Sequence, residues 1–363
     1  MRRIGISTGG GDAPGLNAVI RAVCKTAINE YGYEVFGIRN GLDGLFEPGG
    51  VFPLSHEDVR GILPQGGTIL GAANRGNPFV RKSTREDGEV VIEDITEKYI
   101  DRIKLLGLDA LVLIGGDGTL KIAHDLWKHG INVVGVPKTI DNDVGGTDVT
   151  FGFDTAVNIA SEAFDRLHTT AESHHRVMIL ELMGRDAGFI ALHAGISGGA
   201  DVILIPEIPF MFEAVCRKVQ ERIARGSKFS IISVAEGAHP HGGQKVYKRA
   251  GDELYVARLG GIGQVVGKFV ESICGAETRV TVLGHLQRGG TPTAFDRWLA
   301  TCFGSEAVRM LAQGKYGRMV ALRGRKLTSV KLEEVLAAPK RVDINGDSVQ
   351  TARALGIVLG DEA

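Results

Sequence analysis

The segment "PKTIDND", residues 137–143, follows the apolar run "INVVGV" and carries most of its chemistry in four side chains: Lys138, Thr139, Asp141 and Asp143. This spacing at a strand end is typical of a metal site, a catalytic base or ordinary turn chemistry. In phosphoryl transfer, Asp141 would accept a hydroxyl proton, Thr139 would donate to phosphoryl oxygens and Asp143 would orient the pair. As a turn, the same residues would form Asx and ST turns.

Two glycine-rich loops follow apolar runs in a similar way. In "GISTGGGDAPGLNAVIRAV", glycines including Gly11 precede a helical pattern, which favours a phosphate site at a helix N-terminus over a plain tight turn. The loop lacks the Rossmann and Walker A glycine orders. In "LIGGDGTLKIA", Asp117 precedes Gly118 and Thr119. A carboxylate there suits Mg²⁺ bridging phosphate oxygens, and a helix cap is the alternative.

Four arginines lie near predicted strand ends or in glycine-rich loops, and the guanidinium group binds phosphate through a planar fork. They are Arg176, Arg185, Arg279 and Arg288. This pattern predicts a phosphorylated substrate. Each neighbouring motif has a structural alternative: "MGR" as a strand terminus, Glu236 as a surface acid and His285 as a structural histidine.

The elements that must position these residues are apolar runs alternating with helical patterns. The runs are "RRIGIST", "EVFGIR", "ALVLIGGDG", "INVVGVPKT", "VMILELMGRD", "DVILIPEI", "FSIISVAEG" and "RVTVLGHLQRGG". Runs apolar on both faces and separated by helices predict parallel sheets covered on both sides, an α/β fold. Ligands of such folds bind outside the carboxyl ends of the strands, where these loops lie. The tail from about Leu327 is more polar and shows no site-like motif.

Bulk composition narrows the range of partners. The chain has 363 residues and a formal net charge of -1, so no global field favours nucleic acid or an anionic membrane. No apolar run approaches the roughly 18 residues of a membrane span, and the start does not resemble a signal peptide. The four scattered cysteines are typical of a reducing compartment. We therefore expect a cytoplasmic protein.

The motifs "TGGGDAPGLNAVIR", "GGDGT", "PKTIDND", "HHR", "MGR", "ETRVTVLGHLQRGG" and "FDR" stand in order over nearly the whole chain. Together they resemble the 6-phosphofructokinase family of the bacterial type. The resemblance implies two doubly wound, mostly parallel-sheet α/β domains with the active site in the cleft between them. Residues 1–152 plus 287–337 would form the larger, nucleotide-binding domain. Residues 153–286 plus 338–363 would form the smaller, sugar-phosphate-binding domain.

The resemblance also assigns roles to individual residues. Asp141 would accept the proton of the 1-hydroxyl of fructose 6-phosphate, with Thr139, Asp143, Arg185 and Gly11 completing the catalytic set. The nucleotide-binding set would be Gly11, Arg75, Asp117, Gly118 and Thr119, with Asp117 serving Mg²⁺. The substrate-binding set would be Thr139, Asp141, Arg176, Met183, Gly184, Arg185, Glu236, Arg279, His285 and Arg288. Arg176 and Arg279 would come from a neighbouring subunit of a homodimer or homotetramer.

Two positions bear on the phosphoryl donor. Family members that use pyrophosphate typically carry Asp at the position of Gly118 and Lys at the position of Lys138. A side chain at position 118 would fill space that a nucleotide needs, so Gly118 favours ATP, whereas Lys138 is typical of pyrophosphate use. ATP and fructose 6-phosphate are therefore the expected substrates, and pyrophosphate is the alternative donor.

Two further alternatives remain. One is another kinase of the GGDGT group acting on NAD or a lipid alcohol, against which "ETRVTVLGHLQR" and "MGR" argue. The other is a non-catalytic sensor of sugar phosphate and nucleotide, against which the presence of both Asp117 and Asp141 argues.

Overall fold

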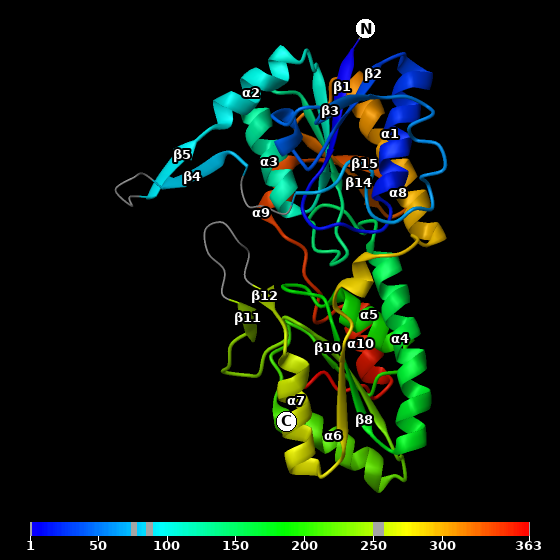
Figure 1. The fold of residues 1–363 in the computed structure, drawn as a ribbon. Helices are drawn as coiled ribbons and strands as arrows, with labels where there is room; N and C mark the ends of the chain where they lie inside the picture. Colours follow the sequence, from blue (N-terminus) through cyan, green and yellow to red (C-terminus); the bar gives the residue numbers. More distant parts are fainter. Residues whose placement is uncertain (1, 74–77, 85–89, 250–257, 363) are drawn as a thin grey trace.

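The computed structural model describes residues 2–73, 78–84, 90–249 and 258–362. Two main sheets organise them (Figure 1). The first has the strand order β15-β14-β7-β6-β1-β2-β3. Its strands in chain order are β1 (Arg3–Thr8), β2 (Glu34–Ile38), β3 (Val51–Leu54), β6 (Ala110–Gly115), β7 (Val133–Pro137), β14 (Arg318–Arg323) and β15 (Lys326–Lys331). The central strands are parallel, and only the edge strands β3 and β15 pair antiparallel.

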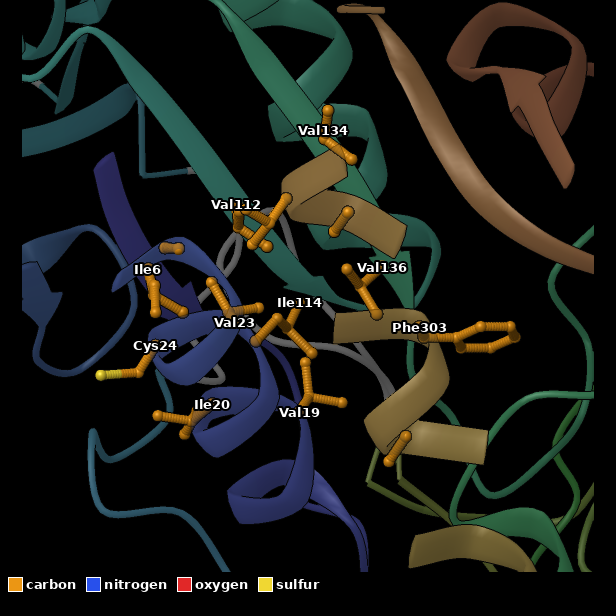
Figure 2. Packing of buried hydrophobic residues seen from close by; sticks show 14 of the residues in the cluster. Ile6, Val19, Ile20, Val23, Cys24, Val112, Ile114, Val134, Val136 and Phe303 are labelled. Atoms are coloured by element: carbon orange, nitrogen blue, oxygen red, sulfur yellow. The ribbon is translucent and has the colours of Figure 1, made fainter. Parts of the chain in front are cut away.

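Helices cover both faces of the first sheet. On one face lie α1 (Leu16–Tyr31) and α8 (Ala294–Ala312); on the other lie α2 (Thr96–Leu105), α3 (Asp117–Lys128) and α9 (Leu332–Ala337). Successive side chains of β6 point to opposite faces of the sheet, which explains this arrangement: Val112 and Ile114 face α1 and α8, while Leu111 and Leu113 face the other helices. Figure 2 shows Val112 and Ile114 packed among side chains of α1 and Phe303 of α8.

The second sheet has the order β13-β8-β10-β9, and all its pairs are parallel. Its strands are β8 (Val177–Leu182), β9 (Val202–Leu204), β10 (Ser230–Ala235) and β13 (Thr278–Val282). One face is covered by α4 (Phe153–His174), α5 (Phe189–Ser197) and α10 (Asp347–Ala354), and the other by α6 (Phe212–Ala224) and α7 (Ile262–Cys274). The predicted α/β class with mostly parallel sheets is confirmed.

Chain crossings connect the two halves of the molecule. Helix α8 follows the second sheet in sequence but packs against α1 on the first, and the chain returns from α9 to α10 beside the second sheet (Figure 1). The short helices η1 (Asp43–Leu45) and η2 (Gly284–Arg288) and the hairpins β4 (Val80–Thr84)–β5 (Val90–Asp94) and β11 (Tyr247–Arg249)–β12 (Arg258–Leu259) complete the described elements. None of the helices in the described ranges is long and apolar enough to cross a membrane.

The strand order fixes where loops converge. In the first sheet the chain runs from β1 to β2 on one side and later to β6 and β7 on the other, so the order reverses between β1 and β6. In the second sheet the same reversal occurs at β8, which lies between β13 and β10. Ligands of open α/β sheets bind at the carboxyl ends of strands at such reversals.

Candidate active site

The loop after β7 presents its polar side chains by alternation. Lys138, Ile140 and Asn142 are buried, whereas Thr139, Asp141 and Asp143 remain partly accessible. This burial pattern turns the Thr139 hydroxyl and the two carboxylates toward the accessible side of the loop. Ile140 anchors the other side in the core of the second sheet.

Hydrogen bonds hold this loop in place. Asn142 adopts a positive φ of 56°, and its Oδ1 accepts a bond from the backbone N–H of Thr150 at 3.1 Å. The Thr150 hydroxyl donates to the carbonyl of Thr139 at 2.8 Å, and the backbone N–H of Asp141 donates to the Thr139 hydroxyl at 3.1 Å. Asparagine is one of the few residues besides glycine that tolerates such a φ, so the sequence "DND" suits the turn.

Asp141 has the environment of a proton acceptor. Its Oδ1 is buried and has no hydrogen-bond partner among the described residues. Burial and then the neighbouring Asp143 carboxylate raise the pKa of Asp141, with Glu236 adding to the rise and Arg288 and Arg185 opposing it. Burial likewise raises the pKa of Asp143. Groups from both sheets therefore surround Asp141.

Lys138 is buried behind the loop rather than displayed in it. Its side chain is 3% exposed, and its ammonium group donates to the carbonyl of Gly11. Burial and then Arg288 lower the pKa of Lys138 to about 7, against the raising effects of Asp12 and the two loop carboxylates. In this arrangement Lys138 ties the loop after β7 to the glycine loop after β1.

The glycine loop after β1 packs closely against its neighbours. The N–H groups of Gly9 and Gly10 donate to the carbonyls of Ile114 and Ala73 at 2.9 and 3.1 Å, so they are not available to a phosphate. A Cβ on Gly11 would lie 2.9 Å from Nη1 of Arg288, which itself donates to the carbonyl of Asp12 at 3.1 Å. The predicted anion site therefore falls to Gly11 and the residues after it.

Asp117 and Gly118 open helix α3 at the carboxyl end of β6. Partial removal from water and the Asp143 carboxylate raise the pKa of Asp117 to about 6, although the residue stays accessible. A Cβ on Gly118 would meet no protein atom within 4 Å. Thr119 is buried, and its hydroxyl faces the Cβ position of Gly9, so this side chain packs behind the glycine loop.

The second sheet contributes residues from the ends of β8, β10 and β13. Gly184 adopts a φ of 134°, which glycine alone tolerates without strain. A Cβ on Gly237 would collide with the carbonyl of Arg185, so the ends of β8 and β10 approach closely. The Lys245 ammonium group donates a hydrogen bond to the carbonyl of Arg185 at 2.8 Å. Met183 is partly buried against the hydrophobic core on the α4 and α5 face of the second sheet, and Glu236 directly follows β10. The exposed His285 lies on η2 together with Arg288.

Two of the predicted residues lie away from the carboxyl ends of their strands. Arg176 directly precedes β8 and Arg279 is the second residue of β13, roughly 20 Å and roughly 10 Å along the strands from their carboxyl ends. There Arg176 pairs with Glu277 at 2.9 Å, and Arg279 pairs with the same carboxylate. Arg75 lies outside the described residues.

The structure also places a residue near the site that the sequence motifs do not mark. Arg341, in the chain between α9 and α10, lowers the pKa of both Asp117 and Asp143 through its charge. The neighbouring Lys340 donates its backbone N–H to the carbonyl of Asp143 at 2.8 Å. The only signal in the sequence is a pair of cations in the polar tail, which is equally typical of a surface turn.

Within the described part of the chain, no group of three or more His, Cys, Asp or Glu side chains is arranged to hold a metal ion. The Asp143 carboxylate nevertheless raises the pKa of Asp117 through its charge, and Asp117 is accessible from solvent. Mg²⁺ in phosphate-transfer sites commonly uses one or two carboxylates plus phosphate oxygens. The residues present fit that mode.

Comparison with known proteins gives consistent results. The family model described as phosphofructokinase matches residues 3–311. The chain is 54% identical to the ATP-dependent 6-phosphofructokinase of Chloroflexus aggregans over 361 residues, 99% of this chain and 98% of that one. It is 52% identical to the pyrophosphate–fructose 6-phosphate 1-phosphotransferase of Streptomyces coelicolor over 343 residues, 94% of this chain and 96% of that one. The structure of phosphofructokinase from Saccharomyces cerevisiae matches with a TM-score of 0.78 and 31% identity, covering 98% of this chain and 47% of that one.

Proposed function

The chain belongs to the phosphofructokinase family, and from this premise we propose that it transfers the γ-phosphoryl group of MgATP to the 1-hydroxyl of fructose 6-phosphate. The products are fructose 1,6-bisphosphate and ADP, and the reaction serves glycolysis in the cytoplasm. The observation that carries the proposal is the environment of Asp141, a partly accessible residue whose Oδ1 is buried without a hydrogen-bond partner and whose charged neighbours include Arg288, Arg185 and Glu236.

The mechanism follows from that environment. A carboxylate whose pKa is raised by burial is a stronger proton acceptor than an exposed one, and Asp141 is placed to take the proton of the 1-hydroxyl. The Thr139 hydroxyl and the Gly11 backbone would lie on the donor side of this carboxylate and would contact the transferring group. Arg185 would stabilise the negative charge that spreads over the phosphoryl oxygens in the transition state.

We assign the metal role to Asp117, with Asp143 beside it. Bound Mg²⁺ would neutralise charge on the donor phosphates. The protein's own part is positioning: helix α3 presents Asp117 from its first turn, and the glycine loop, held by its backbone bonds, would set the position of the donor phosphates.

The acceptor side and the domain division complete the assignment. Met183, Gly184, Arg185 and Glu236 would bind the sugar, and His285 and Arg288 would bind its 6-phosphate. Arg176 and Arg279, distant from Asp141 in one chain, would reach the 6-phosphate of a neighbouring subunit in a homodimer or homotetramer. Residues 1–152 plus 287–337 would then be the nucleotide domain, and 153–286 plus 338–363 the sugar-phosphate domain.

Gly118 supports ATP as the donor. A helical glycine costs about 0.5–1 kcal/mol relative to alanine, and no protein atom near the Cβ position of Gly118 requires it. Space for a ligand is a sufficient reason for the residue. Pyrophosphate is the second candidate donor, because a lysine at the position of Lys138 is typical of relatives that use pyrophosphate; its ammonium group here donates to the Gly11 carbonyl, next to the proposed donor site.

A coupled spectrophotometric assay of fructose 1,6-bisphosphate formation tests the proposal. The enzyme is supplied with fructose 6-phosphate and Mg²⁺, and with ATP or pyrophosphate in parallel. We expect a kcat/KM for ATP well above that for pyrophosphate. A higher value for pyrophosphate would reverse the donor assignment, and no product with either donor would refute the reaction itself.

A further inference from the structure

The chain segment between α9 and α10 passes directly beside the candidate active site. A Cβ on Gly145 would collide with the carbonyl of Ala338, so the two backbones lie in contact. The Lys340 backbone N–H donates to the carbonyl of Asp143 at 2.8 Å, and its ammonium group donates to the carbonyls of Thr147 and Asp148. The segment is thereby fixed against the loop that carries Asp141.

Arg341 is held between two anchored neighbours. On one side is Lys340, bonded to the Asp143 carbonyl; on the other is Val342, whose N–H donates to Glu207 at 2.9 Å. Val342 is buried while Arg341 is exposed. The backbone of Arg341 is therefore fixed, and its side chain projects toward solvent on the side of the two carboxylates that it influences.

The charges of the site divide into two sides. Asp141 has Arg288 and Arg185 as cationic neighbours, and both are proposed to bind the acceptor. Asp117 and Asp143 have Arg341 as their cationic neighbour. Arg341 thus lies near Asp117 and Asp143, the two carboxylates that are proposed to hold the Mg²⁺ of the donor.

The guanidinium of Arg341 is available to a ligand. Across the described ranges it makes no ion pair or hydrogen bond with another side chain or carbonyl. Its five N–H donors form a fork that matches two phosphate oxygens. We propose that Arg341 binds the phosphate chain of the phosphoryl donor, as a donor-binding residue supplied by the C-terminal segment. This inference rests on the proposed phosphoryl-transfer function and adds a residue to its donor site.

The test compares Arg341→Ala and Arg341→Lys with the unmodified enzyme, and uses Arg325→Ala as the matched control. Arg325 is also exposed, on the turn between β14 and β15. Equilibrium binding of MgATP and of magnesium pyrophosphate is measured in separate arms, together with KM for each substrate and the melting temperature.

We expect Arg341→Ala to raise Kd and KM for the donor about tenfold to hundredfold, as for a lost charged hydrogen-bonded pair. KM for fructose 6-phosphate should change less than about twofold, and the melting temperature of Arg341→Ala should equal that of the Arg325→Ala control. Arg341→Lys should fall between, because a point charge replaces the fork. The arm with the larger effect identifies the donor whose phosphates Arg341 contacts.

Other results would overturn the inference. Unchanged donor affinity in Arg341→Ala would exclude the contact, and equal losses for both substrates with a lower melting temperature would indicate a structural role. An unmodified enzyme that binds a donor but forms no fructose 1,6-bisphosphate would refute the proposed reaction. The ratio of the donor Kd of Arg341→Ala to that of the unmodified enzyme would then still test the role of Arg341. An enzyme that binds neither donor would refute both.

Discussion

At the scale of single residues, Asp141 combines its proposed role as a base with a cost in stability. Its raised pKa means that folding favours the protonated form, so its stabilising contribution is present below the unfolded pKa of about 3.9 and is lost as pH rises through the folded pKa. Near pH 7.5, where the base must be ionised, the carboxylate is a buried charge with one unpartnered oxygen.

We therefore predict opposite effects of Asp141→Asn on activity and stability. Turnover should fall by about 10²–10⁴-fold, because the amide cannot accept the proton. The free energy of unfolding at pH 7.5 should rise, on the order of 1 kcal/mol, because a neutral group replaces a buried charge. Steady-state kinetics and urea denaturation measure both, with exposed Asp165→Asn as the control for the charge change. Turnover like that of the unmodified enzyme would remove Asp141 from the base role.

Asp143 tunes Asp141 through charge. The Asp143 carboxylate is the largest cause, after burial, of the raised pKa of Asp141. We predict that Asp143→Asn lowers the pKa of Asp141, so the acid limb of kcat/KM for fructose 6-phosphate moves to lower pH. The pH profile at saturating donor measures this shift, whatever the loss in absolute rate. An acid limb that stays in place or moves to higher pH would contradict the coupling.

At the scale of elements, the N-termini of α4 and α8 cap each other beside the site. Buried Asp296 of α8 accepts bonds from the backbone N–H and hydroxyl of Thr155 in α4, at 2.8 and 2.5 Å. In return, the Thr293 hydroxyl at the start of α8 donates to Asp154 of α4 at 2.5 Å. These bonds join a helix of the second sheet to a helix of the first.

Asp296→Ala should lower the free energy of unfolding by about 2–4 kcal/mol, because it leaves two buried donors of Thr155 without an acceptor and removes the cap. Urea denaturation at neutral pH gives the value. The control is Asp165→Ala on the exposed face of the same α4 helix, which should change stability by less than about 0.5 kcal/mol. Equal losses in the two variants would mean that the mutual cap contributes nothing.

The elements differ in how well the sequence predicts them. Every one of the eight apolar runs forms a strand, because continuous Val, Ile and Leu suit a parallel sheet buried on both faces. The hairpin β14–β15 was not predicted. Its outer strand, β15, is an antiparallel edge of "KLTSVK" with mostly partial burial, so its hydrophobic pattern is weak.

The site shows the same contrast between local and long-range information. The loops after β1, β6 and β7 follow their strands directly, so strand order brings Gly11, Asp117 and Asp141 together and the sequence could anticipate it. Arg341 could not be anticipated, because its place depends on a return of the chain from α9 to α10 (Figure 1). Its immediate sequence, "PKRVD", is typical of a surface turn.

At the scale of the whole molecule, we infer that a single chain would present an incomplete 6-phosphate site. Arg279 is half exposed and lies at the amino end of β13, which is an open edge of the second sheet with Thr281 and Val282 also exposed. Such an edge and its cations are suited to meet a second copy of the chain. In a two-fold dimer each copy would then supply Arg279 to the other.

Subunit mixing gives a direct prediction of this arrangement. If each site takes Asp141 from one chain and Arg279 from the other, a hybrid dimer of an Asp141→Asn chain and an Arg279→Ala chain places both defects in one site. The other site of that dimer is then intact. Co-refolding equal amounts of the two poorly active variants should restore about a quarter of the unmodified activity, since about half of the dimers are hybrids with one working site.

The matched control pairs Asp141→Asn with Arg185→Ala. Arg185 influences Asp141 within one chain, so every site of that hybrid retains one defect and no activity should return. Activity of the Asp141→Asn and Arg279→Ala mixture equal to the mean of the two parents would show that Arg279 does not cross between subunits. Restoration in the mixture and not in the control requires that the 6-phosphate site be assembled from two chains, because only a shared site can combine Asp141 of one copy with Arg279 of the other.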